Sequence, residues 1–165
     1  MATRRQFIFA GTALAAGLST RLFARAAPAT PPGEPFEITH TDEQWRAMLS
    51  PGQYRVLRQA GTEAPYSSPL NSEHRKGIFS CAGCELPLYS SATKFESHTG
   101  WPSFWAPLEH AIGTSTDYAI GVPRTEVHCR RCGGHLGHVF NDGPKPTGLR
   151  YCMNGLALEF KPSPT

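Results

Sequence analysis

Four of the five cysteines of this chain stand in two C-x-x-C pairs, and this pattern constrains the fold most strongly. The pairs are Cys81 with Cys84 and Cys129 with Cys132. The spacing within each pair lets both thiolates bind the same metal ion. Two such turns can complete a tetrahedral four-sulfur site suited to one structural zinc ion. The glycines at 83, 133 and 134 suit tight turns with positive φ. Because 44 residues separate the pairs, more than in a compact zinc ribbon, we expect the metal to join distant hairpins of one sheet.

The N-terminal segment has the pattern of an export signal. Arg4 and Arg5 precede an apolar run of 12 residues, and Ala24-Arg25-Ala26 offers a small-x-small cleavage site. We interpret residues 1–26 as a twin-arginine signal peptide, residues 27–36 as a proline-rich linker and residues 37–165 as the folded domain. We therefore expect a periplasmic protein without stable membrane insertion after cleavage. An uncleaved anchor is the alternative, although 12 apolar residues fall short of the roughly 20 that span a bilayer.

Export makes disulfides the main alternative to zinc, because exported proteins meet an oxidising environment. A disulfide within C-x-x-C closes a very small loop and would stabilise little, whereas cross-paired disulfides stay open as an alternative. A redox-active pair is expected near the start of a helix, which neither pair shows. Twin-arginine substrates generally cross the membrane already folded, so zinc could be loaded in a reducing cytoplasm and protect the thiolates afterwards.

Removal of the signal changes the charge of the protein. Four of the 16 basic residues lie in residues 1–26, so the remaining 139 residues carry 12 basic and 13 acidic side chains. The domain is therefore close to neutral and lacks the general basic field that attracts nucleic acid or anionic lipid. We expect no nucleic-acid partner.

Secondary-structure signals predict a mainly β domain. Thr41 and Ser50 are helix-capping residues, the second before a proline, and indicate two short helices between about 41 and 60. Short β-prone runs separated by Gly and Pro follow, and they predict a mainly antiparallel β-core with a small helical layer before it. The expected strands cover residues 77–80, 104–108, 116–122, 125–128, 136–140, 149–153 and 156–160.

Cys152 is the fifth cysteine, and a four-sulfur site leaves it without a metal to bind. A lone cysteine is more often a buried core residue than a nucleophile, but its neighbours favour chemistry. Arg150 lies two residues earlier on a predicted strand, so it shares a face with Cys152 and can stabilise a thiolate there. Asn154 is expected on the same face. His135 and His138, with an aspartate nearby, could form a metal site, a proton relay or a polar patch beside a turn, and with the zinc site complete we favour proton transfer.

These segments resemble the B-type methionine sulfoxide reductases, which reduce the R epimer of methionine sulfoxide in peptides and proteins. The resemblance covers roughly residues 37–161. Its motifs, as they stand here, are Phe79-Ser80-Cys81-Ala82-Gly83-Cys84, Gly100-Trp101-Pro102-Ser103-Phe104, the second cysteine pair, His135 to Gly143, and Arg150-Tyr151-Cys152-Met153-Asn154. The resemblance implies two small antiparallel sheets, arranged like a tent, with short N-terminal helices and a structural zinc site away from the active site.

Matched motif by motif, Cys152 resembles the family's nucleophile, which attacks the sulfoxide sulfur and is left as a sulfenic acid. His138, with His135 close by, matches the histidines that supply protons to the departing oxygen. Three further positions match residues that polarise and order the site: Asp142, Arg150 and Asn154. Trp101 matches the aromatic wall against which the substrate methyl group packs, and a tryptophan of the core is the alternative.

One position departs from the pattern. Many members of the family carry a cysteine directly before the Gly-Trp-Pro-Ser-Phe segment, where it resolves the sulfenic acid as a disulfide, but this chain has Thr99. We therefore expect a one-cysteine cycle in which an external thiol, from a thioredoxin-like reductant, attacks Cys152.

A zinc-ribbon-like binding module without catalysis is the alternative function, but it leaves Cys152 unexplained. A different thiol enzyme, such as a peroxidase, would leave the segments from Gly100 and from His135 unexplained.

Overall fold

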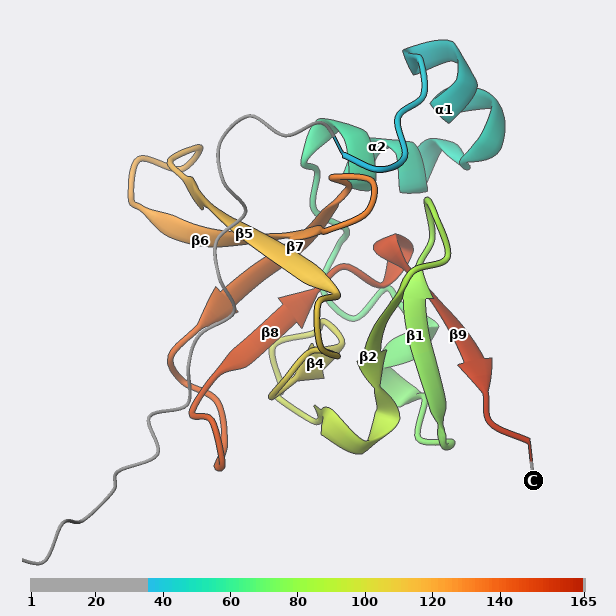
Figure 1. Cartoon of the computed structure of the whole chain (residues 1–165). Coiled ribbons are helices and arrows are strands. Elements are labelled where there is room, and N and C mark those ends of the chain that lie inside the picture. Colours follow the sequence, from blue (N-terminus) through green and yellow to red (C-terminus); the bar gives the residue numbers. More distant parts are fainter. Residues whose placement is uncertain (1–35, 165) are drawn as a thin grey trace, which may run out of the picture.

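The computed structural model describes residues 36–164, in which two antiparallel sheets meet below a pair of short helices (Figure 1). The predicted signal peptide lies outside the described residues, as does the predicted linker except for Phe36. None of the helices in the described part of the chain is long and apolar enough to cross a membrane.

The two helices begin at the capping residues that predicted them. In α1 (Asp42–Met48) the Thr41 hydroxyl accepts a hydrogen bond from the Gln44 amide, and the Gln44 side chain accepts one from the Thr41 amide. Ser50 and Gln53 make the same reciprocal capping box at the start of α2 (Pro51–Gln59). Each box satisfies two backbone donors that a helix start leaves free, which confirms both predicted helices.

Two sheets of unequal size form the body of the domain, and every strand pair is antiparallel. The smaller sheet has the order β2-β1-β9 and the larger the order β3-β4-β8-β7-β6-β5. The mainly β architecture with two antiparallel sheets is therefore confirmed. The strands are β1 (Gly77–Cys81), β2 (Pro87–Ser90), β3 (Lys94–Phe95), β4 (Ser103–Phe104), β5 (Ile112–Asp117), β6 (Arg124–Cys129), β7 (His135–Phe140), β8 (Arg150–Met153) and β9 (Leu158–Pro162). One short 3-10 helix, Pro69–Ser72, precedes β1, and two more lie between strands, at Ser91–Thr93 and Gly155–Ala157.

The strand predictions fail where the runs are short or apolar residues face solvent. β2 and β3 were not predicted, because four and two residues give too little alternation to recognise. The strand expected over 116–122 is wrong beyond Asp117, since the chain turns there and leaves Tyr118, Ile120 and Val122 exposed. The strand expected over 104–108 ends at Phe104.

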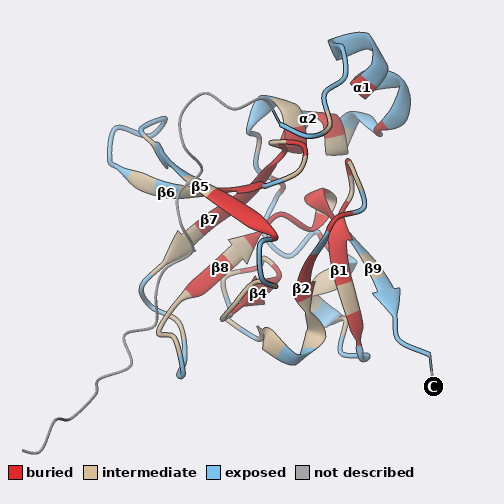
Figure 2. Ribbon diagram, viewed as in Figure 1, coloured by how far each residue is buried: buried red, intermediate tan, exposed pale blue. Residues whose placement is uncertain are grey.

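Aromatic packing joins the two sheets at the core. Tyr89 of β2 stacks on Phe104 of β4 with ring centroids 4.4 Å apart, and Phe79 of β1 meets the same ring edge-on at 5.0 Å. Met153 of β8 is fully buried beside them and accepts a hydrogen bond from the Tyr89 hydroxyl at 3.2 Å. Figure 2 shows buried residues concentrated where the two sheets face each other. Because side chains alternate along a strand, Met153 in the core directs its neighbour Cys152 to the other face of the sheet.

Candidate active site and metal centre

The four paired cysteines converge on one point between the sheets. Their Sγ atoms all lie within 4.8 Å of one another, with Cys81 3.7 Å from Cys132 and Cys84 3.5 Å from Cys129. Cys81 ends β1 of the small sheet, whereas Cys129 ends β6 of the large sheet. The expectation that the metal joins hairpins of one sheet is therefore wrong, because the cluster joins one turn from each sheet.

The arrangement of the four sulfur atoms fits a metal ion. Metal–sulfur bonds of about 2.3 Å in a tetrahedron give sulfur–sulfur edges of about 3.8 Å, close to the separations of the Cys81–Cys132 and Cys84–Cys129 pairs. A disulfide needs about 2.05 Å, and all five cysteines are free thiols. The thiols are thus positioned to bind a metal ion, and four soft thiolates in a tetrahedron form a donor set typical of zinc.

The glycines beside the cysteines serve different purposes. Gly133 has the predicted positive φ, +68°, but Gly83 and Gly134 do not, and in the first turn Glu85 takes the left-handed conformation with φ +58°. A Cβ atom at Gly134 would lie 2.9 Å from a Cδ atom of Leu57 in α2. Gly134 therefore allows the helix to pack closely on the second cysteine turn.

Cys152 lies in a row of side chains that crosses the large sheet. It is opposite His138 of β7 on one side and Ser103 of β4 on the other, and His138 is in turn opposite Glu126 of β6. Directly opposed residues of antiparallel strands project from the same face. The register therefore places the thiol, an imidazole and a carboxylate together on the face that points away from the core between the sheets.

Hydroxyl groups surround the partly exposed thiol. The Thr99 hydroxyl lies 3.8 Å from the Cys152 sulfur, and Ser97 bonds both Thr99 at 2.8 Å and Ser103 at 2.7 Å. The nearest side chain to Cys152 from the loop before Gly100 is thus an alcohol. None of the described cysteines outside the metal cluster remains to pair with Cys152.

A β-bulge brings the two histidines together. Residues three apart on a regular strand point to opposite faces, so His135 and His138 would normally be separated by the sheet. The register shifts here, because Val127 faces Gly137 while the next residue, His128, faces His135. The extra residue in β7 rotates His135 onto the face of His138, and the ring centroids are 5.4 Å apart.

Each imidazole is bonded to a carboxylate that the sequence did not single out. Nδ1 of His135 lies 2.7 Å from Oε1 of Glu126, and Nε2 of His138 lies 2.8 Å from Oδ2 of Asp117. Burial lowers the pKa of His138, and the hydrogen bond to Asp117 opposes this effect. Both carboxylates lie in segments predicted to be strands, but only the true register shows that they face the histidines.

Arg150 lies on the same face as Cys152 and forms a forked ion pair with Asp142. Its Nε and Nη2 atoms donate to the two carboxylate oxygens at 2.9 and 2.8 Å, and its guanidinium lies 4.4 Å above the centre of the Phe140 ring. The hydrogen bond to Asp142, followed by the negative charge of a Cys152 thiolate, raises the pKa of Arg150. A fixed positive charge therefore lies beside the candidate nucleophile.

Asn154 and Trp101 are both anchored to Glu63, a buried residue that sequence reasoning missed. β8 ends at Met153, and Asn154 follows it with an extended backbone as the residue before a 3-10 helix. Its Oδ1 accepts from the Glu63 amide at 2.9 Å, and its Nδ2 donates to the Leu136 carbonyl at 3.1 Å. The half-buried Trp101 ring donates from Nε1 to the Glu63 carbonyl at 3.2 Å. No sequence pattern marks this glutamate, because its carboxylate accepts from the backbone amides of Gly155 and Leu156, about 90 residues further along the chain.

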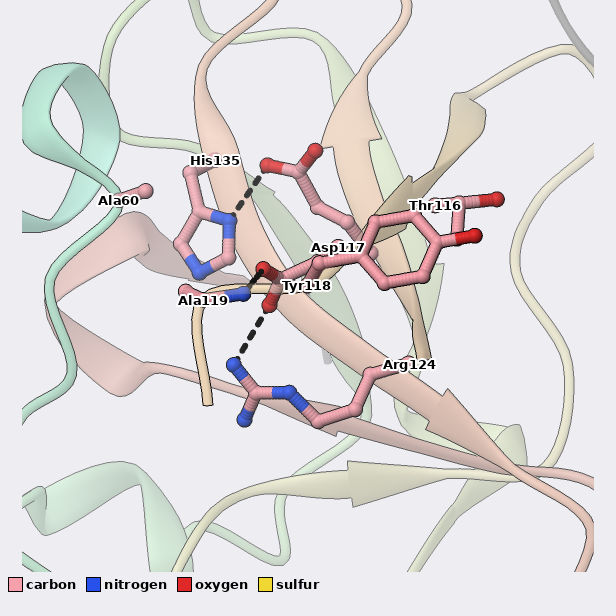
Figure 3. Close-up of a pocket in the computed structure, with 8 residues that line it drawn as sticks. Ala60, Thr116, Asp117, Tyr118, Ala119, Arg124 and His135 are labelled. Carbon is pink, nitrogen blue, oxygen red and sulfur yellow. Dashed lines mark hydrogen bonds and ion pairs between the residues drawn. The ribbon is translucent and has the colours of Figure 1, made fainter. Parts of the chain in front are cut away.

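A pocket of about 230 Å3 opens beside His135 (Figure 3). His135 forms part of its wall together with the turn after β5 and the end of α2. Figure 3 also shows Asp117 bonded to Arg124 and to the Ala119 amide. The lining residues are Ala60, Thr116, Asp117, Tyr118, Ala119, Arg124, Glu126 and His135.

Comparison with known proteins gives consistent matches over the described domain. The sequence profile of the SelR domain matches residues 49–162, a range that contains every candidate site residue. The chain is 55% identical over 127 residues to the peptide methionine sulfoxide reductase MsrB of Pseudomonas putida strain W619, covering 76% of this chain and 96% of that protein. Proteins of the same description from Leptospira interrogans and Agrobacterium fabrum are 50% and 47% identical over 127 residues, again 76% of this chain, and are covered over 97% and 94% of their lengths.

Proposed function

We propose that this chain, which belongs to the SelR family and is a methionine-R-sulfoxide reductase of the B type, uses one catalytic cysteine, Cys152. Its substrates are oxidised peptides and proteins. The observation that carries this proposal is the position of the Cys152 thiol. It lies opposite His138, beside the Arg150 guanidinium and apart from the four clustered cysteines.

In the first step the Cys152 thiolate attacks the sulfoxide sulfur while the sulfoxide oxygen takes up a proton. The attack forms a sulfur–sulfur bond, and this bond and the substrate sulfur–oxygen bond then break as the protonated oxygen passes to the cysteine sulfur. The substrate leaves as methionine and Cys152 becomes a sulfenic acid. The methionine sulfur is reduced by two electrons and the cysteine sulfur is oxidised by two. Thiol and sulfoxide together supply all the atoms, so this step needs no further reactant.

The neighbouring residues suit this step. His138 faces Cys152 across the β7–β8 pair and supplies the proton, with His135 beside it. Arg150, held by Asp142, stabilises the thiolate. The Trp101 ring packs against the substrate methyl group, and Asn154 keeps that ring in place through their shared partner Glu63.

The second step requires a thiol from another molecule. Thr99 is the side chain next to Cys152 where a resolving cysteine would act, and the remaining four cysteines lie in the metal cluster. An external thiol attacks the sulfenic acid, releasing water and forming a mixed disulfide, and a second thiol of the reductant then releases Cys152. A dithiol protein of the thioredoxin type supplies both thiols.

We propose that the metal bound by Cys81, Cys84, Cys129 and Cys132 is zinc. When bound, it stabilises the fold, because four cysteine ligands fill its coordination and leave no position for substrate. These residues lie in turns of different sheets and would hold the sheets together.

We further propose export by the twin-arginine pathway and a periplasmic location. The arginine pair, apolar run and cleavage pattern in residues 1–26 support this proposal. N-terminal sequencing of the exported protein tests it, and an N-terminus that retains Arg4 and Arg5 would refute cleavage.

The test of the mechanism uses a peptide with one methionine R-sulfoxide and no added reductant. We expect one methionine per chain and a dimedone-trapped sulfenic acid on Cys152, detected by mass spectrometry. Cys152→Ser should yield neither product, and a peptide with the S-sulfoxide serves as the substrate control. Methionine formation by Cys152→Ser at the rate of the unsubstituted enzyme would refute the assignment.

A further inference from the structure

Two carboxylates, Asp117 of β5 and Glu126 of β6, form hydrogen bonds with the two histidines of the site. Glu126 bonds Nδ1 of His135 at 2.7 Å, and Asp117 bonds Nε2 of His138 at 2.8 Å. The described structure thus pairs each imidazole with its own carboxylate, and Figure 3 shows the bond from His135. Neither carboxylate lies in the motifs that identified the site.

Both carboxylates are themselves fixed in position. Asp117 accepts from the Ala119 amide at 2.7 Å and from Arg124 at 2.5 Å, in addition to His138. Glu126 accepts from the Ser115 hydroxyl at 2.5 Å through its second oxygen. A carboxylate with several donors can orient an imidazole more firmly than one that is free to rotate.

The hydrogen bonds also keep both groups ionised. The bond from His135 lowers the pKa of Glu126 to about 2. The Ala119 amide, followed by His138, holds the pKa of Asp117 well below its usual range. At neutral pH each carboxylate therefore acts only as an acceptor, and the imidazole nitrogen that faces it carries the hydrogen.

This pairing gives the two histidines opposite tautomers. His135 carries its hydrogen on Nδ1 and presents Nε2, which is buried and bonds to none of the described residues. His138 carries its hydrogen on Nε2 and presents Nδ1, which likewise makes no hydrogen bond within residues 36–164. Each imidazole is left with one nitrogen that can accept and return a proton.

We propose that Asp117 and Glu126 are positioning residues of the reductase reaction, fixing the orientation and tautomer of His138 and His135 for proton delivery to the sulfoxide oxygen. The inference rests on the proposed function, because it assigns the carboxylates a part in the Cys152 reaction. His138 takes the thiol proton on Nδ1 and passes it to the sulfoxide oxygen, so the proton balance of the step is closed.

The surroundings of His138 determine how loss of Asp117 would act. The charged or titratable groups facing it are Asp117 from β5, Arg124 and Glu126 from β6, His135 from β7, and Cys152 with the nearby Arg150 from β8. Burial and Arg124 disfavour the imidazolium, whereas Asp117 favours it. Asp117→Asn removes the favourable charge and leaves Arg124 in place, so the protonated form of His138 becomes harder to reach.

The first experiment measures the pH dependence of kcat/KM for an R-sulfoxide peptide between pH 5 and 9. We expect Asp117→Asn to move the alkaline limb to lower pH by about one unit and to reduce kcat/KM at pH 8 about tenfold. Glu126→Gln should reduce kcat/KM because an amide can turn its donor toward His135 and disturb the tautomer. Glu159→Gln, an exposed residue of β9, is the matched control and should leave the profile unchanged. Unchanged profiles for both Asp117→Asn and Glu126→Gln would overturn the proposal.

The second experiment reads the tautomers directly by 15N NMR of the histidine rings, without any substrate. We expect Nε2–H for His138 and Nδ1–H for His135 in the unsubstituted protein, with each assignment lost in the variant that lacks its carboxylate. Other tautomers in the unsubstituted protein would overturn the proposal even if a variant failed to fold. Activity that survives Cys152→Ser would instead refute the proposed function, while the NMR result still decides the positioning role.

Discussion

Thr99→Cys should convert the one-cysteine cycle into an internally resolved one. The Thr99 hydroxyl oxygen lies 3.8 Å from the Cys152 sulfur, and a disulfide needs about 2.05 Å between its sulfur atoms. The introduced sulfur must therefore move about 1.8 Å closer than the present oxygen. Rotation of a partly exposed side chain in the loop before Gly100 can supply much of this movement.

The expected gain in stability follows from the length of chain that the new bond would close. Positions 99 and 152 are 53 residues apart, and loop-closure entropy for such a loop stabilises the folded state by about 4 kcal/mol relative to the reduced variant. Strain in the new bond would subtract from this value. The midpoint of urea unfolding should thus rise when Thr99→Cys is oxidised by substrate and fall again on reduction.

The assay mixes enzyme with one equivalent of R-sulfoxide peptide and dimedone, without reductant. The unsubstituted protein should give a dimedone adduct on Cys152, whereas Thr99→Cys should give a disulfide between positions 99 and 152 and no adduct. Thr125→Cys adds a thiol at an exposed position of β6 and should behave like the unsubstituted protein. An adduct of equal yield in Thr99→Cys would refute the geometry, and an internal disulfide in the unsubstituted protein would refute the one-cysteine cycle.

Three further predictions concern the framework of the site. Asn154→Ala should lower the free energy of unfolding, measured in urea, by about 2 kcal/mol, because it leaves the buried Glu63 amide without its acceptor. The control Asn141→Ala, at an exposed position, should change it by less than about 0.5 kcal/mol. Equal effects of the two variants would argue against an anchoring role for Asn154. Gly137→Ala should lower the melting temperature, because its Cβ would lie 2.1 Å from the carbonyl oxygen of Cys152 on the neighbouring strand, and an unchanged melting curve would contradict this close approach. Chelation of the unsubstituted protein should release one metal ion per chain and lower the melting temperature, and Cys84→Ser should reproduce this loss; full stability without metal would exclude a structural role.

The metal centre was predictable from sequence because its signal is local. Two residues separate the cysteines of each pair, and a turn of this length brings two sulfur atoms together whatever the rest of the chain does. The helices were predictable for the same reason, since Thr41 and Ser50 bond backbone groups only three residues away. The sequence did not predict that the two cysteine turns belong to different sheets, because strand order depends on pairings between distant segments.

The histidine pair shows where sequence reasoning fails. The spacing of His135 and His138 predicts opposite faces of a strand, and only the bulge between β6 and β7 places them together. Register also decides that Glu126 lies opposite His138 while its carboxylate bonds His135. A one-residue slip would move each side chain to the other face, so no local motif contains this information.

The second cysteine turn lies close to the proposed proton donors of the site. Cys129 ends β6 three residues after Glu126, and His135 begins β7 three residues after Cys132. The metal-binding turn is therefore the connection between the two strands that carry this carboxylate and this imidazole. If this turn widened, the Glu126–His135 hydrogen bond would be the first to lengthen, because both residues lie close to the turn. Cys152 lies one strand further away, on β8. The four cysteines take no part in the proposed chemistry of Cys152, but their turn joins the strand pair that carries the proposed proton donors, so loss of the metal should also reduce activity.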